Sequence, residues 1–331
     1  MLEAPNKRVF VDLFHLMLAE KDDERADQLC LELVQYWRDL AGFETSHEAF
    51  QYAKSGLILS PNMAGNCAFG LTRTRRYLTA VYQRVSALLR DQPDNLPVRV
   101  LYPGCGPYGI LVLPLLVLFS AKQLIVDVID FHAVSIRCLK QIVHVFDLED
   151  RIQSSVGDAL EYQIPEAQMP DLIVSELLLA GLEKEGHVAI NEHLLKQAPD
   201  AILIPEKIDI SLCFVDPETE FDQQETIKDR LCLGLVFSMN RNSLLAADSN
   251  SDLMTAETLI VPEYMNPKWV PCLFTHIQLC DELVIKEYEN GLTTPVVYSL
   301  PKDFHKANKL VFSYNKGHMP GLLCSAVFSK V

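Results

Sequence analysis

At 331 residues the chain is long enough for one large domain or two ordinary ones, and a hydrophobic content of 49% is sufficient for a sizeable core. Its formal net charge of −15, from 29 basic and 44 acidic residues, repels nucleic-acid phosphates, so we expect no nucleic-acid partner, and the charge suits a basic substrate. Nine scattered cysteines without a Cys-x-x-Cys pair argue against a zinc site or a redox pair and fit a reducing compartment.

The chain is also expected to stay outside membranes. Its N-terminal stretch has no signal-peptide pattern. The longest apolar run, 110–119, is about half a membrane span and contains Pro114, so it is typical of a buried helix. We therefore expect a cytoplasmic protein with no membrane contact and no metal site.

Residues 1–95 are predicted to form a helical N-terminal region. Apolar side chains recur at helical spacing over Val9–Leu18 and Leu29–Leu40. The polar stretch 91–95, followed by Pro97, ends the last helix.

Strands alternate with helices over 96–205. Helices are predicted at 110–118 and 133–145, and the predicted strands are 98–101, 124–129, a segment before Asp158, 172–174 and 201–204. This alternation is typical of a parallel, doubly wound sheet, so the predicted fold class is α/β with a Rossmann-like domain.

The pattern changes after Pro205. Short β-rich runs separated by Pro and Gly predict a mostly antiparallel, barrel-like domain over 206–331. Within it, 216–253 is polar with an apolar centre at 231–237. This segment is interpreted as an arm, a lid or a plain insertion.

A glycine-rich turn follows the first predicted strand. Gly104, Gly106 and Gly109 have the Gly-x-Gly-x-x-Gly spacing between a strand and a helix. Glycines allow a tight turn and close approach of a ligand, and the next helix offers free N–H groups. A turn without a ligand is the alternative.

Two aspartates follow later strands of the same region. Asp130 ends the second predicted strand, where a carboxylate can accept hydrogen bonds from ribose hydroxyls or cap the next helix. Asp158 is placed to accept from an adenine amino group or to form a Gly-Asp turn. The spacing from the glycine turn does not separate NAD from S-adenosylmethionine.

An acidic pair, Glu176 and Glu185, follows the strand at 172–174. Two carboxylates beside a nucleotide-like ligand indicate that a cation is held there, which favours a transferase acting on a basic nitrogen. The alternative is a solvated helix face over 183–185, with Glu176 at the helix start.

Further motifs occur in a characteristic order. They are Arg73-Thr74-Arg75-Arg76-Tyr77, the glycine turn, Asp130, Asp158, Ser175-Glu176 with Glu185, Ile202–Glu206, Thr275-His276 and Gly291–Thr293. In these the chain resembles class I S-adenosylmethionine-dependent methyltransferases, and within them the protein arginine methyltransferases. The resemblance covers roughly residues 50–300.

The resemblance implies a role for each motif. Arg73 would bind the methionine carboxylate of S-adenosyl-L-methionine, whereas a surface arginine cluster is the alternative without the resemblance. Glu176 and Glu185 would bind a guanidinium, since each carboxylate accepts a fork of N–H donors. His276 would contact the substrate or order the acidic segment, or be structural. The family also implies a homodimer, with 216–253 as a candidate arm.

The departures from the family lie on the acceptor side. Tyr102-Pro103 replaces an acid before the glycine turn, Leu177–Ala180 replaces Trp-Met-Gly-Tyr, and Ile277 replaces a tryptophan. We therefore favour free L-arginine or a related small guanidino metabolite as substrate, with an arginine-containing peptide or protein as the alternative. Outside this class, an NAD-dependent oxidoreductase and an inactive scaffold of the same fold remain.

Overall fold

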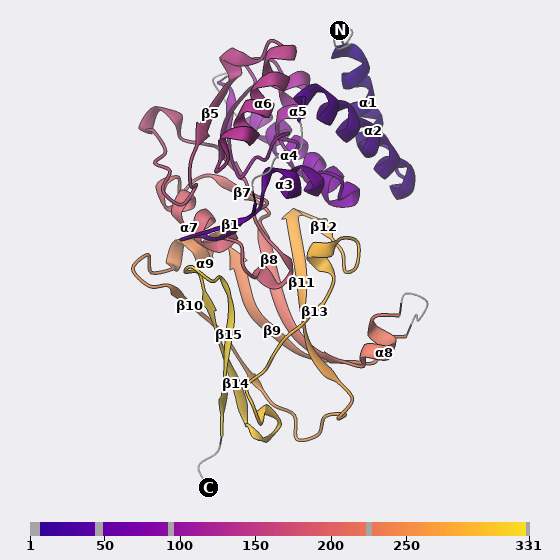
Figure 1. Cartoon of the computed structure of the whole chain (residues 1–331), viewed down its shortest axis with the longest axis vertical. Coiled ribbons are helices and arrows are strands. Elements are labelled where there is room, and N and C mark those ends of the chain that lie inside the picture. The colour runs from indigo at the N-terminus through magenta and orange to yellow at the C-terminus, as the bar shows by residue number, and fades with distance from the viewer. Residues whose placement is uncertain (1–6, 44–48, 92–95, 223–226, 329–331) are drawn as a thin grey trace.

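The computed structural model describes residues 7–43, 49–91, 96–222 and 227–328 (Figure 1). Helices and a parallel sheet form the part of the molecule near the N-terminus, and antiparallel strands form the part near the C-terminus. The predicted α/β class, with a helical N-terminal region and a mostly-β C-terminal part, is confirmed. The first proposed domain boundary, at 95/96, adjoins 92–95, which lie outside the described residues.

The N-terminal helices are α1 (Lys7–Ala19), α2 (Asp23–Ala41), α3 (Pro61–Cys67) and α4 (Leu71–Asp91). Helix α2 begins where the Asp22 side chain accepts from the Arg25 N–H, and it ends at Gly42 in the left-handed conformation. Its fully buried Trp37 stacks on Phe146, which follows α6 (Ala133–Val145). The amphipathic pattern therefore places α2 against the sheet domain.

A short hairpin interrupts the region that was predicted to be helical. Strands β1 (Gln51–Ala53) and β2 (Gly56–Ile58) pair antiparallel, and Gly56 has φ 108°. The Leu57 N–H donates to the Lys184 carbonyl at 2.7 Å. This long-range contact stabilises an extended segment whose conformation local periodicity does not reveal.

The parallel sheet has the order β5-β4-β3-β6-β7. Its chain order reverses between β3 and β6, and ligands of such sheets bind at the carboxyl ends of the strands beside this reversal. The carboxyl ends of β4, β3 and β6 are adjacent there. These strands are β3 (Val98–Pro103), β4 (Leu124–Asp130), β5 (Ile152–Val156), β6 (Leu172–Val174) and β7 (Ile202–Ile204).

Helix α5 (Leu113–Leu118) begins three residues later than the predicted helix at 110. Gly109 lies in the left-handed region at φ 53°, and Val112 has φ −130°. The backbone therefore stays outside the helical conformation until Leu113. Helix α7 (His187–Gln197) and the short 3-10 segments Glu149–Arg151, Glu166–Gln168 and Ala180–Leu182 complete this part.

The C-terminal strands form two antiparallel sheets. One has the order β12-β11-β8-β9 with β13 on β11, and the other has the order β10-β14-β15. Phe237 of β9 stacks on Tyr314 of β14 at 4.6 Å between ring centroids and so joins the two sheets. The elements are β8 (Lys207–Val215), α8 (Pro217–Glu220), β9 (Arg230–Asn240), α9 (Arg241–Ala246), β10 (Leu253–Ile260), β11 (Val270–Cys280), β12 (Leu283–Ile285), β13 (Val296–Val297), β14 (Lys309–Asn315) and β15 (Gly321–Val327), with 3-10 segments at Gly291–Thr293 and Phe304–Lys306.

Most of the proposed arm at 216–253 belongs to the β-rich part. Strand β9 pairs with β8 along its length. Helix α8 stands away from the strands in Figure 1. Residues 223–226 lie outside the described part of the chain.

Two of the cysteines form a disulfide, which the sequence interpretation did not expect. Cys213 of β8 and Cys232 of β9 lie directly opposite each other in the strand register. They are 19 residues apart in the sequence, so only strand pairing brings them together.

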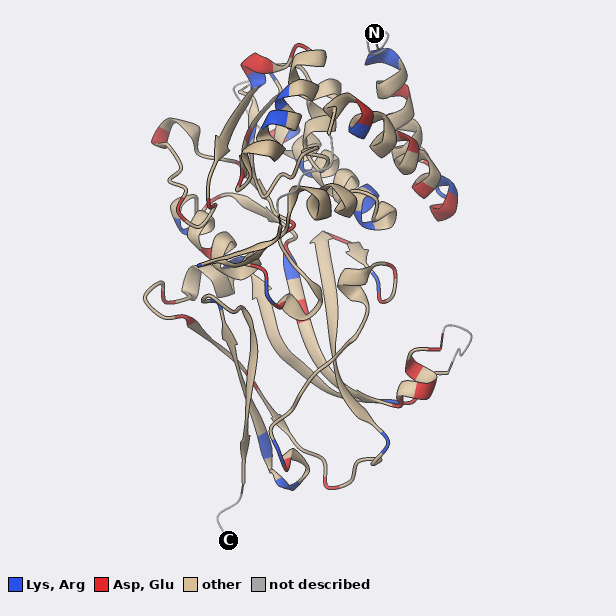
Figure 2. Cartoon of the chain, in the orientation of Figure 1, with Lys and Arg blue, Asp and Glu red and all other residues tan. Residues whose placement is uncertain are grey.

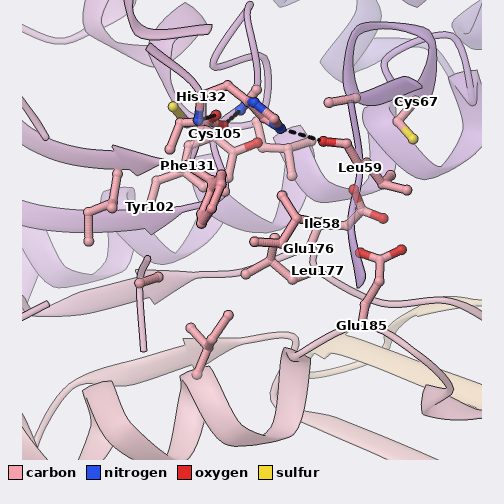
Figure 3. A pocket seen from close by; sticks show the side chains of 18 of the residues that line it. Ile58, Leu59, Cys67, Tyr102, Cys105, Phe131, His132, Glu176, Leu177 and Glu185 are labelled. Atoms are coloured by element: carbon pink, nitrogen blue, oxygen red, sulfur yellow. Dashed lines mark hydrogen bonds between the residues drawn. The ribbon is translucent and has the colours of Figure 1, made fainter. Parts of the chain in front are cut away.

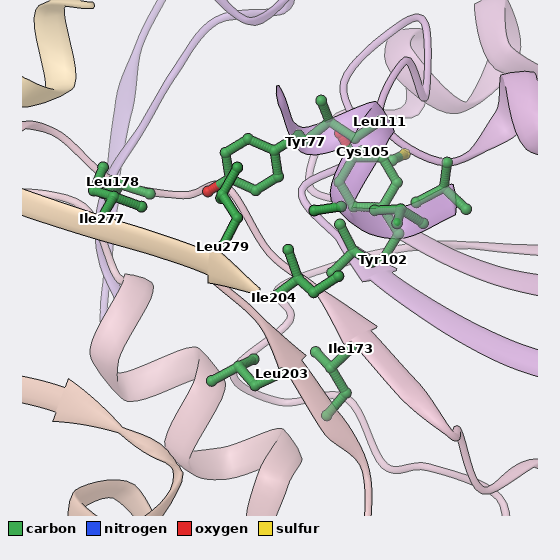
Figure 4. Packing of buried hydrophobic residues seen from close by; sticks show 14 of the residues in the cluster. Tyr77, Tyr102, Cys105, Leu111, Ile173, Leu178, Leu203, Ile204, Ile277 and Leu279 are labelled. Carbon is green, nitrogen blue, oxygen red and sulfur yellow. The ribbon is translucent and has the colours of Figure 1, made fainter. Parts of the chain in front are cut away.

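The parallel sheet and the antiparallel strands share one hydrophobic core. Ile173 and Ile204 of the parallel sheet belong to the same buried cluster as Ile277 and Leu279 of β11. Figure 4 shows Tyr77 of α4 among these side chains. The two parts are therefore joined by packing beside the carboxyl ends of the parallel strands. Within the described residues, no helix is long and apolar enough to span a membrane.

Candidate active site

A cavity lies at the carboxyl ends of β3, β4 and β6 (Figure 3). Its lining includes the hairpin with α3, the start of α4 at Arg73, the glycine turn 104–109, the end of β4, the loop at Asp158, and the acidic loop, defined as residues 175–186. The sheet order explains this convergence, because the segments that leave three adjacent parallel strands meet at one edge.

The glycine turn has the backbone conformation for which glycine is suited. Gly104, Gly106 and Gly109 have φ of 65°, 62° and 53°. A Cβ atom on Gly104 would lie 2.1 Å from the Leu177 side chain of the acidic loop. The turn and the acidic loop are therefore in direct contact.

Asp130 at the end of β4 lines the cavity and is 7% exposed. Its carboxylate accepts from the Gly106 N–H at 2.8 Å and from the His132 N–H at 2.9 Å. Burial raises the pKa of Asp130, and these two N–H donors oppose the effect. The N-cap of α6 is His132 and has no side-chain cap hydrogen bond, so Asp130 is not the helix cap that was considered as its alternative role. Its place in the cavity is compatible with ribose binding.

Asp158 forms the turn that was considered for it, since its carboxylate accepts from the Leu160 N–H at 2.9 Å. It also lines the cavity beside Gly157. Both interpretations of this residue are therefore compatible with the structure.

The two glutamates of the acidic loop face the same cavity, and Figure 3 shows their carboxylates pointing toward one another. Glu185 is 6% exposed, so the solvated helix face considered for 183–185 is wrong at this position. Burial raises the pKa of Glu176. Burial, with the charge of Glu176 as a second cause, raises the pKa of Glu185 to about 8.

Arg73 of α4 is the counter-charge of this pair. Its Nη1 lies 3.0 Å from the Glu176 carboxylate, and its Nη2 donates to the Cys67 carbonyl. Arg73 is 7% exposed, so it is no member of a surface cluster. The neighbouring Arg75 and Arg76 are paired elsewhere, with Asp23 and Asp27 and with Glu289.

His276 does not reach the cavity, and this corrects its predicted role. It is exposed on β11, opposite Asp209 in the strand register. Side chains alternate along a strand, so its neighbour Thr275 points inward. The Thr275 hydroxyl accepts from the Gly181 N–H at 2.8 Å and thereby contacts the acidic loop.

The sequence interpretation also missed the hairpin beside the acidic loop. Leu57 pairs with Glu185 in an isolated β-bridge, and Ser55 and Leu57 line the cavity. A signal was present, since Lys54-Ser55-Gly56 is a turn sequence between two short apolar runs. Across the described residues, no group of three or more His, Cys, Asp or Glu side chains could hold a metal ion.

The chain matches no family model and no curated protein sequence. It is similar to the solved structure of the Trypanosoma brucei PRMT1 enzyme-prozyme heterotetrameric complex with AdoHcy, at 16% identity over 73% of this chain and 84% of that one, with a TM-score of 0.45. It is also similar to Arabidopsis thaliana protein arginine methyltransferase 10, at 13% identity over 76% and 95% of the two chains and a TM-score of 0.48. It is similar to the crystal structure of PRMT6 at 9% identity over 74% of this chain and 95% of that one, with a TM-score of 0.47. Likeness at this level leaves the function to be argued from the side chains of the cavity.

Proposed function

We propose that this chain is an S-adenosyl-L-methionine-dependent N-methyltransferase that acts on an arginine-type guanidinium. The observation that carries the proposal is the pair of carboxylates of Glu185, which is buried, and Glu176, whose side chain is 14% exposed, in one cavity with the glycine turn and Asp130. Buried carboxylates are costly unless they are paired, so a cavity that holds these two carboxylates beside one arginine suits a second cation.

The residues of the cavity fit the cofactor. The glycine turn offers a close backbone approach, Asp130 would accept from the ribose hydroxyls, and Asp158 would accept from the adenine amino group. Arg73 would pair with the methionine carboxylate. When bound, the cofactor supplies an electrophilic methyl group on a sulfonium.

The carboxylates would orient the acceptor. A guanidinium is planar and presents N–H donors in a fork that matches a carboxylate. The contact of Arg73 with Glu176 shows that this carboxylate accepts a guanidinium at 3.0 Å. With Glu185 on another side, positive charge is drawn toward the nitrogens that do not react, and the remaining nitrogen is presented for in-line displacement.

We further propose a small acceptor, free L-arginine or a related guanidino metabolite. Among the described residues, those that line the cavity all lie between positions 55 and 190, and none belongs to the C-terminal strands. The acidic loop is covered on both sides, because Leu57 donates to the Lys184 carbonyl and the Lys184 N–H donates to the Pro320 carbonyl at 2.8 Å. A small guanidino compound needs no open groove.

A peptide or protein arginine is the alternative acceptor. Strands β1 and β2 have three residues each, so displacement of the hairpin would break few hydrogen bonds and uncover Glu185. The two classes outside methyl transfer are less well supported. Hydride transfer from a nicotinamide gives the acidic pair no role, and a scaffold has no use for a second carboxylate, Glu185, that is buried at a cost in stability.

We also propose a cytoplasmic homodimer whose contact includes α8. The seven free cysteines support the cytoplasmic location, and the Cys213–Cys232 disulfide counts against it.

The proposed activity is tested with purified protein, S-adenosylmethionine and a panel of free arginine, guanidino acids, lysine and an arginine-rich peptide, with S-adenosylhomocysteine release measured by mass spectrometry. We expect turnover on a free guanidino compound and loss of at least about 100-fold in Glu176→Gln and Glu185→Gln. Glu183→Gln is the matched control, since Glu183 is on the same loop but does not line the cavity.

Three other outcomes are informative. Turnover on the peptide alone would select the alternative acceptor. Cofactor binding without turnover on any acceptor would contradict the guanidinium proposal, and binding of NADH in place of S-adenosylhomocysteine would contradict the cofactor.

A further inference from the structure

A polar cluster lies behind the acidic loop, outside the cavity lining. It consists of Ser175 at the start of the loop and of His187 and Asn191 on the first turns of α7. All three side chains belong to residues that are 0% exposed. Polar groups are costly to bury, so three buried polar side chains beside the acidic loop indicate a specific role for them.

The Asn191 amide and the Leu177 N–H are the hydrogen-bond donors of the cluster. Asn191 Nδ2 donates to Ser175 Oγ at 3.1 Å and to the His187 carbonyl at 2.7 Å. Ser175 Oγ lies 3.4 Å from His187 Nδ1, and the Leu177 N–H donates to the same nitrogen at 3.4 Å. The backbone N–H of Leu177 can only donate, so His187 Nδ1 must be the acceptor. The imidazole is then neutral and carries its proton on Nε2.

These contacts reach both neighbours of Glu176. Ser175 precedes it and Leu177 follows it, while Glu185 precedes His187 by two residues in the chain. His187 Nδ1 therefore contacts the Ser175 side chain before Glu176 and the Leu177 backbone after it, and His187 itself follows the segment that carries Glu185.

Stability alone does not explain a histidine here. Among the described residues, His187 Nε2 and Asn191 Oδ1 are buried without a hydrogen-bond partner. An apolar side chain of similar size at position 187 would avoid the cost of the first of these. Burial lowers the pKa of His187 to about 3, in agreement with the neutral form that the contacts require.

We propose that His187 is a positioning residue that sets the placement of Glu176 relative to Glu185 through its Nδ1 acceptor. This inference rests on the proposed guanidinium-binding role of the two glutamates. The ring touches neither cavity nor substrate, so its effect passes through the backbone of the acidic loop. A displacement of about 1 Å in such a pair is sufficient to slow the reaction strongly.

The test compares His187→Asn, which keeps an acceptor oxygen near the position of Nδ1, with His187→Leu, which removes it. The first readout is amide hydrogen exchange of the acidic loop by mass spectrometry, which needs no substrate. We expect exchange at Leu177 to be about fivefold faster in His187→Leu, the factor for one neutral hydrogen bond, and close to wild type in His187→Asn.

The second readout is methyl transfer to the acceptor that the wild type uses. We expect kcat/KM to fall about tenfold or more in His187→Leu and to recover to within about threefold in His187→Asn, with unchanged binding of S-adenosylhomocysteine in both. Equal exchange and equal kinetics in the two variants would overturn the proposal. If the wild type methylates no guanidino acceptor, the proposed function fails, and the exchange experiment still decides whether His187 Nδ1 orders the acidic loop.

Discussion

At the scale of single residues, the site is a charge arrangement that is unfavourable without a cation. Arg73 and Glu185 are buried beside the partly buried Glu176, and of the two glutamates only Glu176 forms an ion pair with Arg73. Burial, together with the charge of Glu176, raises the pKa of Glu185 to about 8. The carboxyl group of Glu185 is therefore mostly protonated near neutral pH. Under the proposed function, an entering guanidinium would pair with Glu185 and favour its ionised form.

Glu185 should therefore lower the stability of the ligand-free protein at high pH. Its pKa rises from 4.5 to about 8 on folding, so between these values the folded state binds more protons than the unfolded state. The free energy of unfolding then falls as pH rises through this window. We expect Glu185→Gln to have a higher Tm than the wild type at pH 9 and a similar Tm at pH 4. A Tm that is lower at pH 9 in Glu185→Gln would contradict a buried, charge-repelled carboxyl.

Acceptor binding should be coupled to the same titration. A guanidinium favours the ionised form of Glu185, so its binding releases a proton below pH 8. We expect the Kd of the guanidino acceptor to decrease as pH rises from 6 to 9, in calorimetry with S-adenosylhomocysteine present. Binding that is independent of pH over this range would indicate that Glu185 is already ionised.

At the scale of elements, the acidic loop is placed by segments that are distant in the sequence. Thr275 on β11 accepts from the Gly181 N–H, the hairpin residue Leu57 donates to Lys184, and Lys184 donates to the Pro320 carbonyl. Each contact uses the backbone of the loop, so the direction of the loop depends on the parallel sheet, the hairpin and the C-terminal strands together.

Thr275 and His276 form a matched pair for testing this dependence. Thr275→Val removes the acceptor for the Gly181 N–H and keeps the shape of the side chain, so we expect a lower stability of about 1–2 kcal/mol and a lower kcat/KM. His276→Ala changes an exposed side chain outside the cavity, and we expect both quantities to be unchanged. Loss of activity in His276→Ala with an active Thr275→Val would restore the role first predicted for the histidine.

A second prediction at the scale of elements concerns the disulfide between Cys213 of β8 and Cys232 of β9. Alkylation of the denatured protein without reductant should label seven cysteines and leave Cys213 and Cys232 unlabelled. Cys232→Ser should lower the free energy of unfolding by about 3 kcal/mol under oxidising conditions, the size expected for a loop of this length. Labelling of all nine would show that the pair is reduced and would favour the cytoplasmic location.

At the scale of the whole molecule, the net charge of −15 comes from residues on many elements. Figure 2 shows acidic residues spread over α1, α2, α8 and the connecting loops. Under the proposed function, the two glutamates of the cavity would recognise the cation. The shared core beside the cavity further implies that the parallel sheet and the antiparallel strands unfold together (Figure 4).

The proposed homodimer is tested at this scale. Multi-angle light scattering should give twice the chain mass of 37.3 kDa. Phe221, 40% exposed beside α8, should weaken the dimer when replaced by Asp, whereas Tyr264→Asp at a position 79% exposed between β10 and β11 is the control. A monomer at assay concentration would remove the proposed arm from consideration.

Local patterns were sufficient for the order of the strands and helices of the parallel sheet and for several residues that line the cavity. Alternating apolar runs predicted β3, β4 and the helix α6 with its observed bounds, and the Gly-x-Gly-x-x-Gly spacing indicated the turn that lines the cavity. The acidic pair was found from its spacing and from its position after a strand. These features depend on residues close in the sequence, where hydrophobic period and turn chemistry act directly.

Tertiary structure alone decided how the residues of the site meet. Arg73 and Glu176 lie 103 residues apart, and Gly181 and Thr275 lie 94 apart, so no local pattern reports these contacts. The pairing of Cys213 with Cys232, the inward turn of Thr275 in place of His276, and the hairpin beside the acidic loop follow from strand register in the same way. The sequence by itself determined which chemical groups the site contains. The packing of the sheet against the antiparallel strands decided their burial, and with it the pKa of Glu185, because desolvation depends on neighbours that only the folded chain supplies.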